Sequence, residues 1–269
     1  MRKPAPVPQP ADVRLMNATA TLLFATVGVM VLAGAGWWVL RHPAFSVARI
    51  AVHGDIAHSS EATLRANVMP RLAGNFFTVD LVQARDAFED VPWVRRAQVR
   101  RAFPNELHVR LQEHQAVAFW GAEGESTLVN SFGEVFEANP GDVDQEGLPR
   151  LSGPLAESAQ VLAAWRALAP LFAQVELPIE QLTLTGRGSW QAVLETGARV
   201  ELGRGSVEEI QARARRFTLT LTQAAGRYGR RPEALVAADL RHVDGYAIRL
   251  RGVSTLGADA QGKNAQAKR

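Results

Sequence analysis

Residues Leu15–Leu40 read LMNATATLLFATVGVMVLAGAGWWVL, and this stretch decides how the rest of the chain is organised. It contains no charged residue, and Arg14 and Arg41 lie on either side of it. As a helix it would be about 39 Å long, which exceeds the roughly 30 Å hydrocarbon core of a bilayer. Trp37 and Trp38 lie at its end, where their rings favour the headgroup region. The sequence therefore predicts a transmembrane helix at residues 15–40.

The alternative to a retained anchor is a cleaved signal peptide, because Ala33-Gly34-Ala35 has the small residues of a cleavage site. The apolar run is longer than the usual signal-peptide core of about 7–15 residues, which favours the anchor. Arg2, Lys3 and Arg14 precede the span, so the positive-inside rule favours a cytoplasmic N-terminus. Residues 1–14 would then form a short, proline-rich cytoplasmic tail, and the bulk of the chain would lie beyond the membrane.

The composition indicates a chain with a sizeable folded core. Of the 269 residues, 47% are hydrophobic and 21% are charged, which is ordinary for a globular protein. A formal net charge of only +3 does not indicate a nucleic-acid-binding protein. Most basic residues are Arg, which suits pairing with carboxylates, although a genomic composition bias is the other explanation. Because the chain has no Cys, disulfides, Cys-based zinc sites and thiol catalysis are excluded.

Residues 45–113 are predicted to form a small α+β domain. In chain order, the predicted elements are a strand at residues 45–54, a helix opened by Ser59-Ser60-Glu61, a second helix from Asp80 to about Glu89, and strands at residues 97–103 and 107–113. Asp80 and Gln83 have the spacing of a capping box. This order of elements is typical of two helices packed on one face of a short sheet.

Residues 114–251 are predicted to form a second domain made mostly of strands, with two helices. The predicted strands lie at residues 116–121, 127–130, 134–136, 179–185, 190–196, 199–202, 235–241 and 245–251, and the helices lie at about residues 154–174 and from Ser206 to about Tyr228. Ser206 and Glu209 form a capping pattern. The last strand is expected at the edge of the sheet, where a partner strand can be added. Residues 252–269 are polar and small, and are expected to be disordered.

No catalytic motif is apparent. The six His residues show no HExxH spacing, and no Gly-x-Ser-x-Gly motif is present. Residues 202–206 precede a helix as a phosphate loop would, but they lack the Gly-Lys-Ser/Thr ending, and a turn with a helix cap explains them better. We therefore expect a protein that is not an enzyme and has no cofactor or metal site.

Five arginines form a basic cluster on the first domain: Arg95, Arg96, Arg100, Arg101 and Arg110. One interpretation is an ordinary solvated sheet face. The other is a docking surface for acidic partners or anionic headgroups, because the domain follows the span directly.

Both domains contain short motifs in a specific order: Val52-His53-Gly54, Pro92-Trp93-Val94, the run from Val99 to Leu107, Glu113-His114, Leu128-Val129-Asn130, Gly133-Glu134-Val135-Phe136, Leu148-Pro149 and Leu151-Ser152-Gly153. In this order they resemble the FtsQ/DivIB family of bacterial cell-division proteins, whose first domain outside the membrane is a POTRA domain. The resemblance covers about residues 15–251. It implies an α+β protein with an N-terminal transmembrane helix (15–40), a POTRA domain (45–113, β-α-α-β-β) and a mostly antiparallel β domain with two helices (114–251).

The resemblance also implies a function and a location. Members of this family are non-enzymatic scaffolds that link early and late division proteins. The chain would be a single-pass type II protein of the cell inner membrane, with a cytoplasmic N-terminus and a periplasmic bulk, enriched at the division septum. The POTRA domain would serve recruitment through other division proteins, and the β domain would bind FtsB and FtsL, with an FtsB segment added as a strand.

The family's partner contacts fall on residues near the end of this chain: Arg187, Arg241, His242, Gly245, Tyr246 and Ile248. The two arginines would pair with partner carboxylates, and the partner strand would lie along Tyr246 and Ile248. Without the resemblance, a solvent-exposed or intramolecular ion pair is the preferred explanation of Arg187 and Arg241, because such exposed pairs are common and contribute little. The family often has an aromatic where His242 stands, so this contact is expected to be weaker or pH-sensitive.

Two other classes of protein remain as alternatives. A membrane-tethered cell-wall hydrolase would need a clustered His/Glu or Ser/Lys site. A POTRA chaperone module of a secretion system would need repeated POTRA units or a following barrel, and the chain shows one copy.

Overall fold

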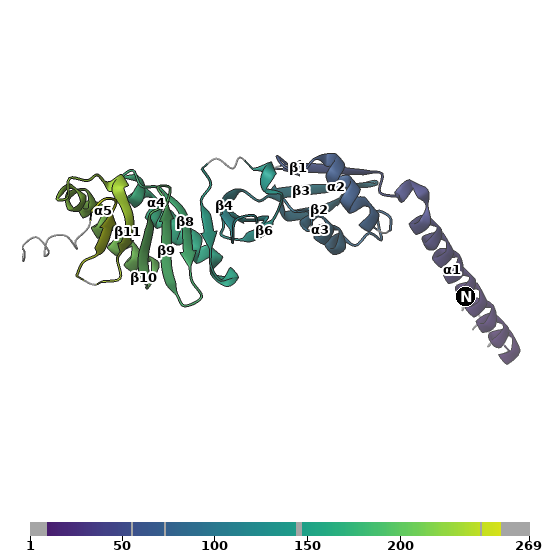
Figure 1. Cartoon of the computed structure of the whole chain (residues 1–269). Helices are drawn as coiled ribbons and strands as arrows, with labels where there is room; N and C mark the ends of the chain where they lie inside the picture. Colours follow the sequence, from purple (N-terminus) through teal and green to yellow (C-terminus); the bar gives the residue numbers. More distant parts are fainter. Residues whose placement is uncertain (1–9, 55, 73, 144–146, 243, 254–269) are drawn as a thin grey trace, which may run out of the picture. The chain divides into compact units, whose positions relative to one another are not determined.

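A computed structural model of the chain describes residues 10–54, 56–72, 74–143, 147–242 and 244–253. The chain divides into two compact units, Met1–Glu113 and His114–Arg269 (Figure 1). The expected tail at residues 1–9 and the expected disorder of residues 254–269 lie outside the described residues.

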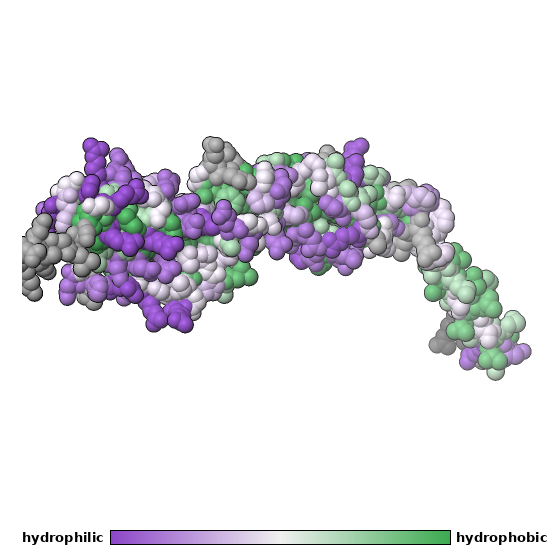
Figure 2. Space-filling model, viewed as in Figure 1, coloured by the Kyte–Doolittle hydropathy of each residue, from purple (hydrophilic) through white to green (hydrophobic). Residues whose placement is uncertain are grey.

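Helix α1 (Ala11–Arg41) is the long apolar helix. It begins one turn earlier than residue 15, because Asp12 and Arg14 continue the helix without belonging to its apolar run. Within the described residues it is the one helix long and apolar enough to cross a membrane. Its apolar stretch has a mean hydropathy of 1.9, and no part of that stretch is buried in the structure. Figure 2 shows its surface as mostly hydrophobic. Such a surface has a favourable environment in a bilayer rather than in water.

The first unit continues with a three-stranded sheet and two helices. Its elements are β1 (Arg49–Gly54), α2 (Glu61–Val68), α3 (Leu81–Glu89), β2 (Val94–Ala102) and β3 (Glu106–Glu113). The sheet order is β1-β3-β2, with β1 parallel and β2 antiparallel to β3. The predicted order of strand, helix, helix, strand, strand is confirmed. The expected strand start at Phe45 is wrong, because Pro43–Phe45 forms a 3-10 turn and the strand begins at Arg49.

One buried cluster joins both helices to the inner face of this sheet. Leu64 of α2 and Phe88 of α3 are each 1% exposed, and both belong to the same cluster as Leu107 and Val109 of β3. Both helices therefore cover the same face, as the element order predicts. The opposite face is more exposed, as the alternating burial along β3 shows; such alternation is typical of strands with one solvated face, and here β3 pairs antiparallel with β2.

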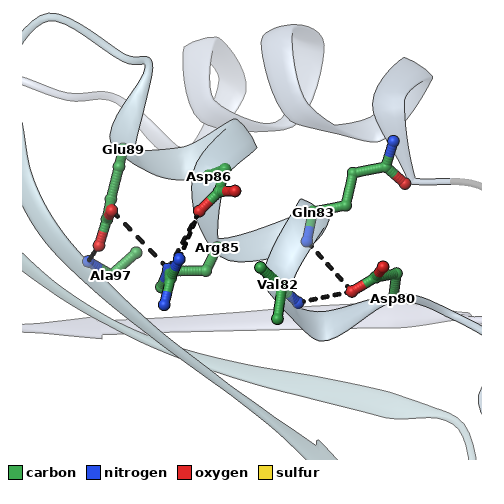
Figure 3. A network of polar contacts seen from close by, with 7 residues as sticks. All are labelled: Asp80, Val82, Gln83, Arg85, Asp86, Glu89 and Ala97. Atoms are coloured by element: carbon green, nitrogen blue, oxygen red, sulfur yellow. Dashed lines mark hydrogen bonds and ion pairs between the residues drawn. The ribbon is translucent and has the colours of Figure 1, made fainter.

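Helix α3 is held at both ends by carboxylates (Figure 3). Asp80 caps its start, where its Oδ1 accepts hydrogen bonds from the N–H of Val82 (2.8 Å) and of Gln83 (3.2 Å). This confirms the predicted cap. At the other end, Glu89 Oε1 accepts a hydrogen bond from the N–H of Ala97 (3.0 Å). The second contact ties α3 to strand β2 and fixes the helix on the sheet.

The second unit is a nine-stranded sheet with two helices. Its elements are β4 (Ala116–Trp120), β5 (Thr127–Asn130), β6 (Val135–Glu137), β7 (Arg150–Ser152), α4 (Ser158–Ala173), β8 (Ile179–Leu184), β9 (Ser189–Leu194), β10 (Arg199–Arg204), α5 (Val207–Gly226), β11 (Leu235–Asp239) and β12 (Ala247–Leu250). The sheet order is β12-β11-β10-β9-β8-β7-β4-β5-β6. Five of its pairings are antiparallel, and β10–β11, β4–β7 and β7–β8 are parallel. The predicted fold class is therefore confirmed.

One expectation for this unit needs correction, and one strand, β7, was missed. The first helix begins at Ser158 rather than Pro154, because Leu155–Glu157 forms a separate 3-10 turn. Strand β7 is too short to give a periodic signal, and its pairing between β4 and β8 is what joins the two halves of the sheet. The predicted edge position of the last strand is confirmed: among the described residues β12 pairs only with β11.

Candidate functional site

The candidate site lies on the half of the large sheet that runs from β8 to β12, and it starts with the hairpin that carries Arg187. This arginine lies in the turn between β8 and β9, and its side chain is exposed. The turn is closed by hydrogen bonds between Thr185 and Ser189, and Gly188 provides a positive φ of 74°. Such a φ favours glycine, so the sequence Gly-Arg-Gly-Ser places an arginine at the tip of a tight turn.

Trp190 attaches this hairpin to the loop before α5. Its ring is almost fully buried, at 1% exposed, and its indole N–H donates to the carbonyl of Gly205 (3.1 Å). Ser206 then caps α5, where its side chain and that of Glu209 form the predicted capping box. The cap fixes the first turns of α5, from which Arg213 projects. The capping interpretation of residues 202–206 is thereby confirmed.

Four arginines from four different elements line one open depression. Arg187 comes from the β8–β9 turn, Arg204 from the end of β10, Arg213 from α5 and Arg241 from the segment after β11. The other lining residues are Thr185, Gly186, Ser189, Gln191 and Gly203, so the lining includes no carboxylate. This depression, which we call the arginine depression, suits an acidic ligand.

Gly203 allows the arginines to approach one another. Its φ is +81°, and a Cβ at this position would lie 2.9 Å from Arg241 Cγ and 3.0 Å from Arg213 Nη1. Any side chain here would therefore push the two arginines apart as well as strain the backbone.

Arg241 is held by an intramolecular ion pair. Its Nε donates to Asp239 Oδ1 (2.9 Å), and its backbone N–H donates to the same oxygen (3.0 Å). The hydrogen bond from Arg241 lowers the pKa of Asp239 to about 2, and the same contact raises the pKa of Arg241. The pair is therefore ionised at neutral pH. The intramolecular alternative for Arg241 is thus present, while its side chain remains 61% exposed.

A second, small hollow lies beside the arginine depression. It is lined by His242, Gly245, Tyr246 and Leu240, together with Arg213 and Arg216 of α5. Arg213 lines both hollows and so connects them. The structure thereby brings Arg187, Arg241, His242, Gly245 and Tyr246 into one continuous region.

Two of the predicted contact residues are engaged by their own domain. Tyr246 is half-buried, its hydroxyl lies 2.7 Å from Thr220 Oγ1, and its ring stands edge-on to Phe217 with centroids 5.0 Å apart. Ile248 is half-buried and packs against the main core. In this region β12 therefore offers a partner its outer backbone edge, while these two side chains hold the strand in place.

Three residues of this region were missed by sequence reasoning: Arg204, Arg213 and Asp239. Arg204 was hidden in a stretch explained by turn and cap, and Arg213 is one of three arginines along α5 with no periodic distinction. Asp239 lies two residues before Arg241, a spacing that puts both side chains on one side of an extended chain. That spacing is the one signal that could have revealed the pair.

The basic cluster of the first unit lies mostly at the surface. Arg96, Arg100, Arg101 and Arg110 are exposed, and Arg95 is half-buried. Arg101 also holds the loop before α3, because its Nε donates to the carbonyl of Phe76 (2.8 Å) and its Nη2 to that of Val79 (2.6 Å). The docking interpretation of the cluster stays a prediction.

Among the residues that the structure describes, no three His, Asp or Glu side chains lie close enough together to hold a metal ion. Glu113 is the most deeply buried carboxylate among the described residues of the first unit, and it accepts hydrogen bonds from the N–H groups of Ala57, His58 and Ser59 (2.9–3.0 Å). Its role is to hold the β1–α2 loop.

Comparisons with known proteins agree on one family. Residues 45–114 match the family described as POTRA domain, FtsQ-type, and residues 118–241 match the family described as cell division protein FtsQ/DivIB, C-terminal. The chain is 41% identical to a cell division protein FtsQ of Burkholderia pseudomallei, covering 94% of this chain and 98% of the relative. It is 38% identical to that of Thiomonas arsenitoxydans (94% and 93% covered) and 36% identical to that of Bordetella pertussis (89% and 92% covered).

Proposed function

The chain belongs to the FtsQ/DivIB family of bacterial cell division proteins, and on this premise we propose that it is a non-enzymatic scaffold of the divisome. It links early and late division proteins. The POTRA domain (45–113) serves recruitment by other division proteins, and the β domain (114–251) binds FtsB and FtsL.

The proposed location follows from α1. Residues 15–40 span the inner membrane once, residues 1–14 are a cytoplasmic tail, and both folded domains lie in the periplasm, with enrichment at the septum. The charge-free apolar run and the three basic residues before it support this orientation.

The single observation that carries the partner proposal is the edge strand β12, which follows directly after Gly245 and Tyr246 of the small hollow that Arg213 connects to the arginine depression. An FtsB segment adds to β12 as a further strand, and its acidic side chains pair with Arg187 and Arg241. Edge backbone groups provide affinity in this mode of recognition, while side-chain contacts provide register. His242 and Gly245 adjoin the path of the partner, and Tyr246 and Ile248 hold the strand that receives it.

The test is a titration of the full-length chain, in detergent or nanodiscs, with the periplasmic segment of FtsB. Arg187→Glu is the decisive variant, because this side chain is exposed at a turn and its replacement leaves the core intact. We expect at least a tenfold loss of affinity, about 1.4 kcal/mol, since a carboxylate replaces a cation opposite an acidic partner.

The matched control is Arg227→Glu. Arg227 is also exposed, but it follows the C-terminal end of α5, while the arginine depression lies at the N-terminal end. The 20-residue helix separates the two by about 30 Å. Equal losses for both variants would mean that only the net charge matters, and no binding by the wild type would reject the partner.

A further inference from the structure

Four phenylalanines from three separate segments meet at one end of the POTRA domain. Phe45 precedes β1, Phe76 and Phe77 lie in the loop before α3, and Phe103 lies in the β2–β3 turn. Ring centroids are 5.0 Å apart for Phe45–Phe77, 5.2 Å for Phe76–Phe77 and 6.2 Å for Phe76–Phe103. We call this group the aromatic patch.

The outer members of the aromatic patch are unusually exposed. Phe103 is 79% exposed and Phe77 is 43% exposed, whereas Phe76 is buried beneath them. Single exposed apolar residues are common on proteins, but neighbouring aromatic rings held together on a surface point to a contact with an apolar environment.

The patch is held rigidly. Asn75 Oδ1 accepts hydrogen bonds from the N–H groups of Phe77 (3.0 Å) and Thr78 (3.1 Å), which fixes the turn that presents Phe77. The N–H of Phe76 donates to the carbonyl of Phe45 (2.7 Å), and Arg101 donates to the carbonyl of Phe76. The loop is thus tied both to β2 and to the segment that follows α1. A preformed surface loses little conformational entropy when it binds.

The length of the chain limits how far the patch can lie from the membrane. Phe45 comes four residues after Arg41, the last residue of α1. Four residues reach at most about 14 Å, and the interfacial layer adds roughly 5–8 Å beyond the hydrocarbon core on each side. Trp37 and Trp38 already occupy the last turn of α1. Phe45, and with it the loop bonded to it, therefore lies within reach of the interfacial layer.

We propose that Phe45, Phe77 and Phe103 form a membrane-contact surface that inserts into the interfacial layer and seats the POTRA domain on the bilayer. This inference rests on the proposed anchoring by α1 and adds a second contact to it. Trp rings favour the headgroup layer, and Phe side chains bury at the boundary between headgroups and acyl chains, so the patch extends the belt that Trp37 and Trp38 begin. Seating restricts the orientations of the POTRA domain, and hence which of its faces remains open to division proteins.

The test uses fluorescent labels in the full-length chain, reconstituted into vesicles of phosphatidylethanolamine and phosphatidylglycerol. Because the chain has no Cys, a single introduced Cys can be labelled uniquely. An environment-sensitive fluorophore is placed at Phe103→Cys, and quenching by nitroxide-bearing lipids is measured. We expect a blue-shifted emission and strong quenching by shallow nitroxides. Adding Phe77→Glu should reduce the quenching, while a thermal melt verifies that the domain stays folded.

Two further label positions make the outcome decisive. Ile56→Cys is the matched control, since Ile56 is an exposed apolar residue (41%) beyond the opposite end of β1. Trp38→Cys reports on α1 itself. Quenching at Trp38 and Phe103 but not at Ile56 supports the seating. Quenching at Trp38 alone, or equally at Phe103 and Ile56, overturns it while the anchor stands. No quenching at Trp38 would reject the anchor, and the seating with it.

Discussion

At the scale of single residues, Glu113 shows how one carboxylate can organise a loop. Three backbone N–H groups and the ring of His58 converge on its two oxygens. Burial alone would raise its pKa, but the hydrogen bonds from His58 and Ser59 together outweigh burial, and the pKa of Glu113 is lowered. A carboxylate with a lowered pKa stabilises the folded state when it is ionised.

Replacing Glu113 by Gln should therefore destabilise the POTRA domain by about 1–3 kcal/mol at neutral pH, since buried N–H groups lose a charged acceptor. The stabilisation by Glu113 is fully present above its unfolded pKa, near 4.5, and is lost as the pH falls through its lower folded value. The difference between wild type and variant in urea unfolding should shrink below that pH. Glu106→Gln, which removes an exposed pair with Arg49, should change stability by less than about 1 kcal/mol.

Substitutions at two glycines of the candidate site should have different effects on the stability of the β domain. Gly203→Ala strains a backbone at φ +81° and drives a methyl group against Arg241 and Arg213, so we expect a loss of about 1–3 kcal/mol. Gly245 has no atom within 4 Å of its would-be Cβ. Gly245→Leu should leave the melting temperature unchanged while weakening FtsB binding. A large destabilisation by Gly245→Leu would contradict the open position of this residue.

At the scale of elements, helix α5 links stability to the site. Its capping box fixes the turn that presents Arg213 to both hollows. Ser206→Ala should lower the free energy of unfolding by about 1 kcal/mol, which corresponds to roughly 2–4 °C in Tm for a domain of this size. Calorimetry measures this directly, and an unchanged Tm would show that the cap contributes nothing.

The sequence predicts elements well where a local signal exists. The caps at Asp80 and Ser206 and the edge position of β12 are confirmed, because each depends on neighbouring residues or on chain order. The starts at Phe45 and Pro154 were wrong for a shared reason: a 3-10 turn precedes each element and carries no periodic pattern of its own.

At the scale of the whole molecule, the candidate site could not be assembled from the sequence by periodicity. Arg187, Arg204, Arg213 and Arg241 come from four elements, and the sheet order and the packing of α5 bring them together. The resemblance to the FtsQ/DivIB family supplied Arg187 and Arg241, while Arg204 and Arg213 needed the fold. The family itself could be recognised from the sequence, and the comparisons confirm it.

The division of the chain into two compact units suits a scaffold protein. The first unit includes the apolar helix α1, and each unit has its own buried core. Separate cores allow separate surfaces to bind different partners. The proposed division of labour, recruitment by the POTRA domain and FtsB binding by the β domain, follows this arrangement.

Hydrogen exchange of the full-length chain in nanodiscs, with and without FtsB, tests the central claim most directly. The account predicts that amides of β12 (Ala247–Leu250) gain protection when FtsB binds, because an added strand pairs with their free edge. The opposite edge of the same sheet, β6 (Val135–Glu137), is the internal control and should not change. Binding that leaves β12 unprotected, or that protects β6 equally, would contradict the proposal that FtsB docks as a strand at this edge.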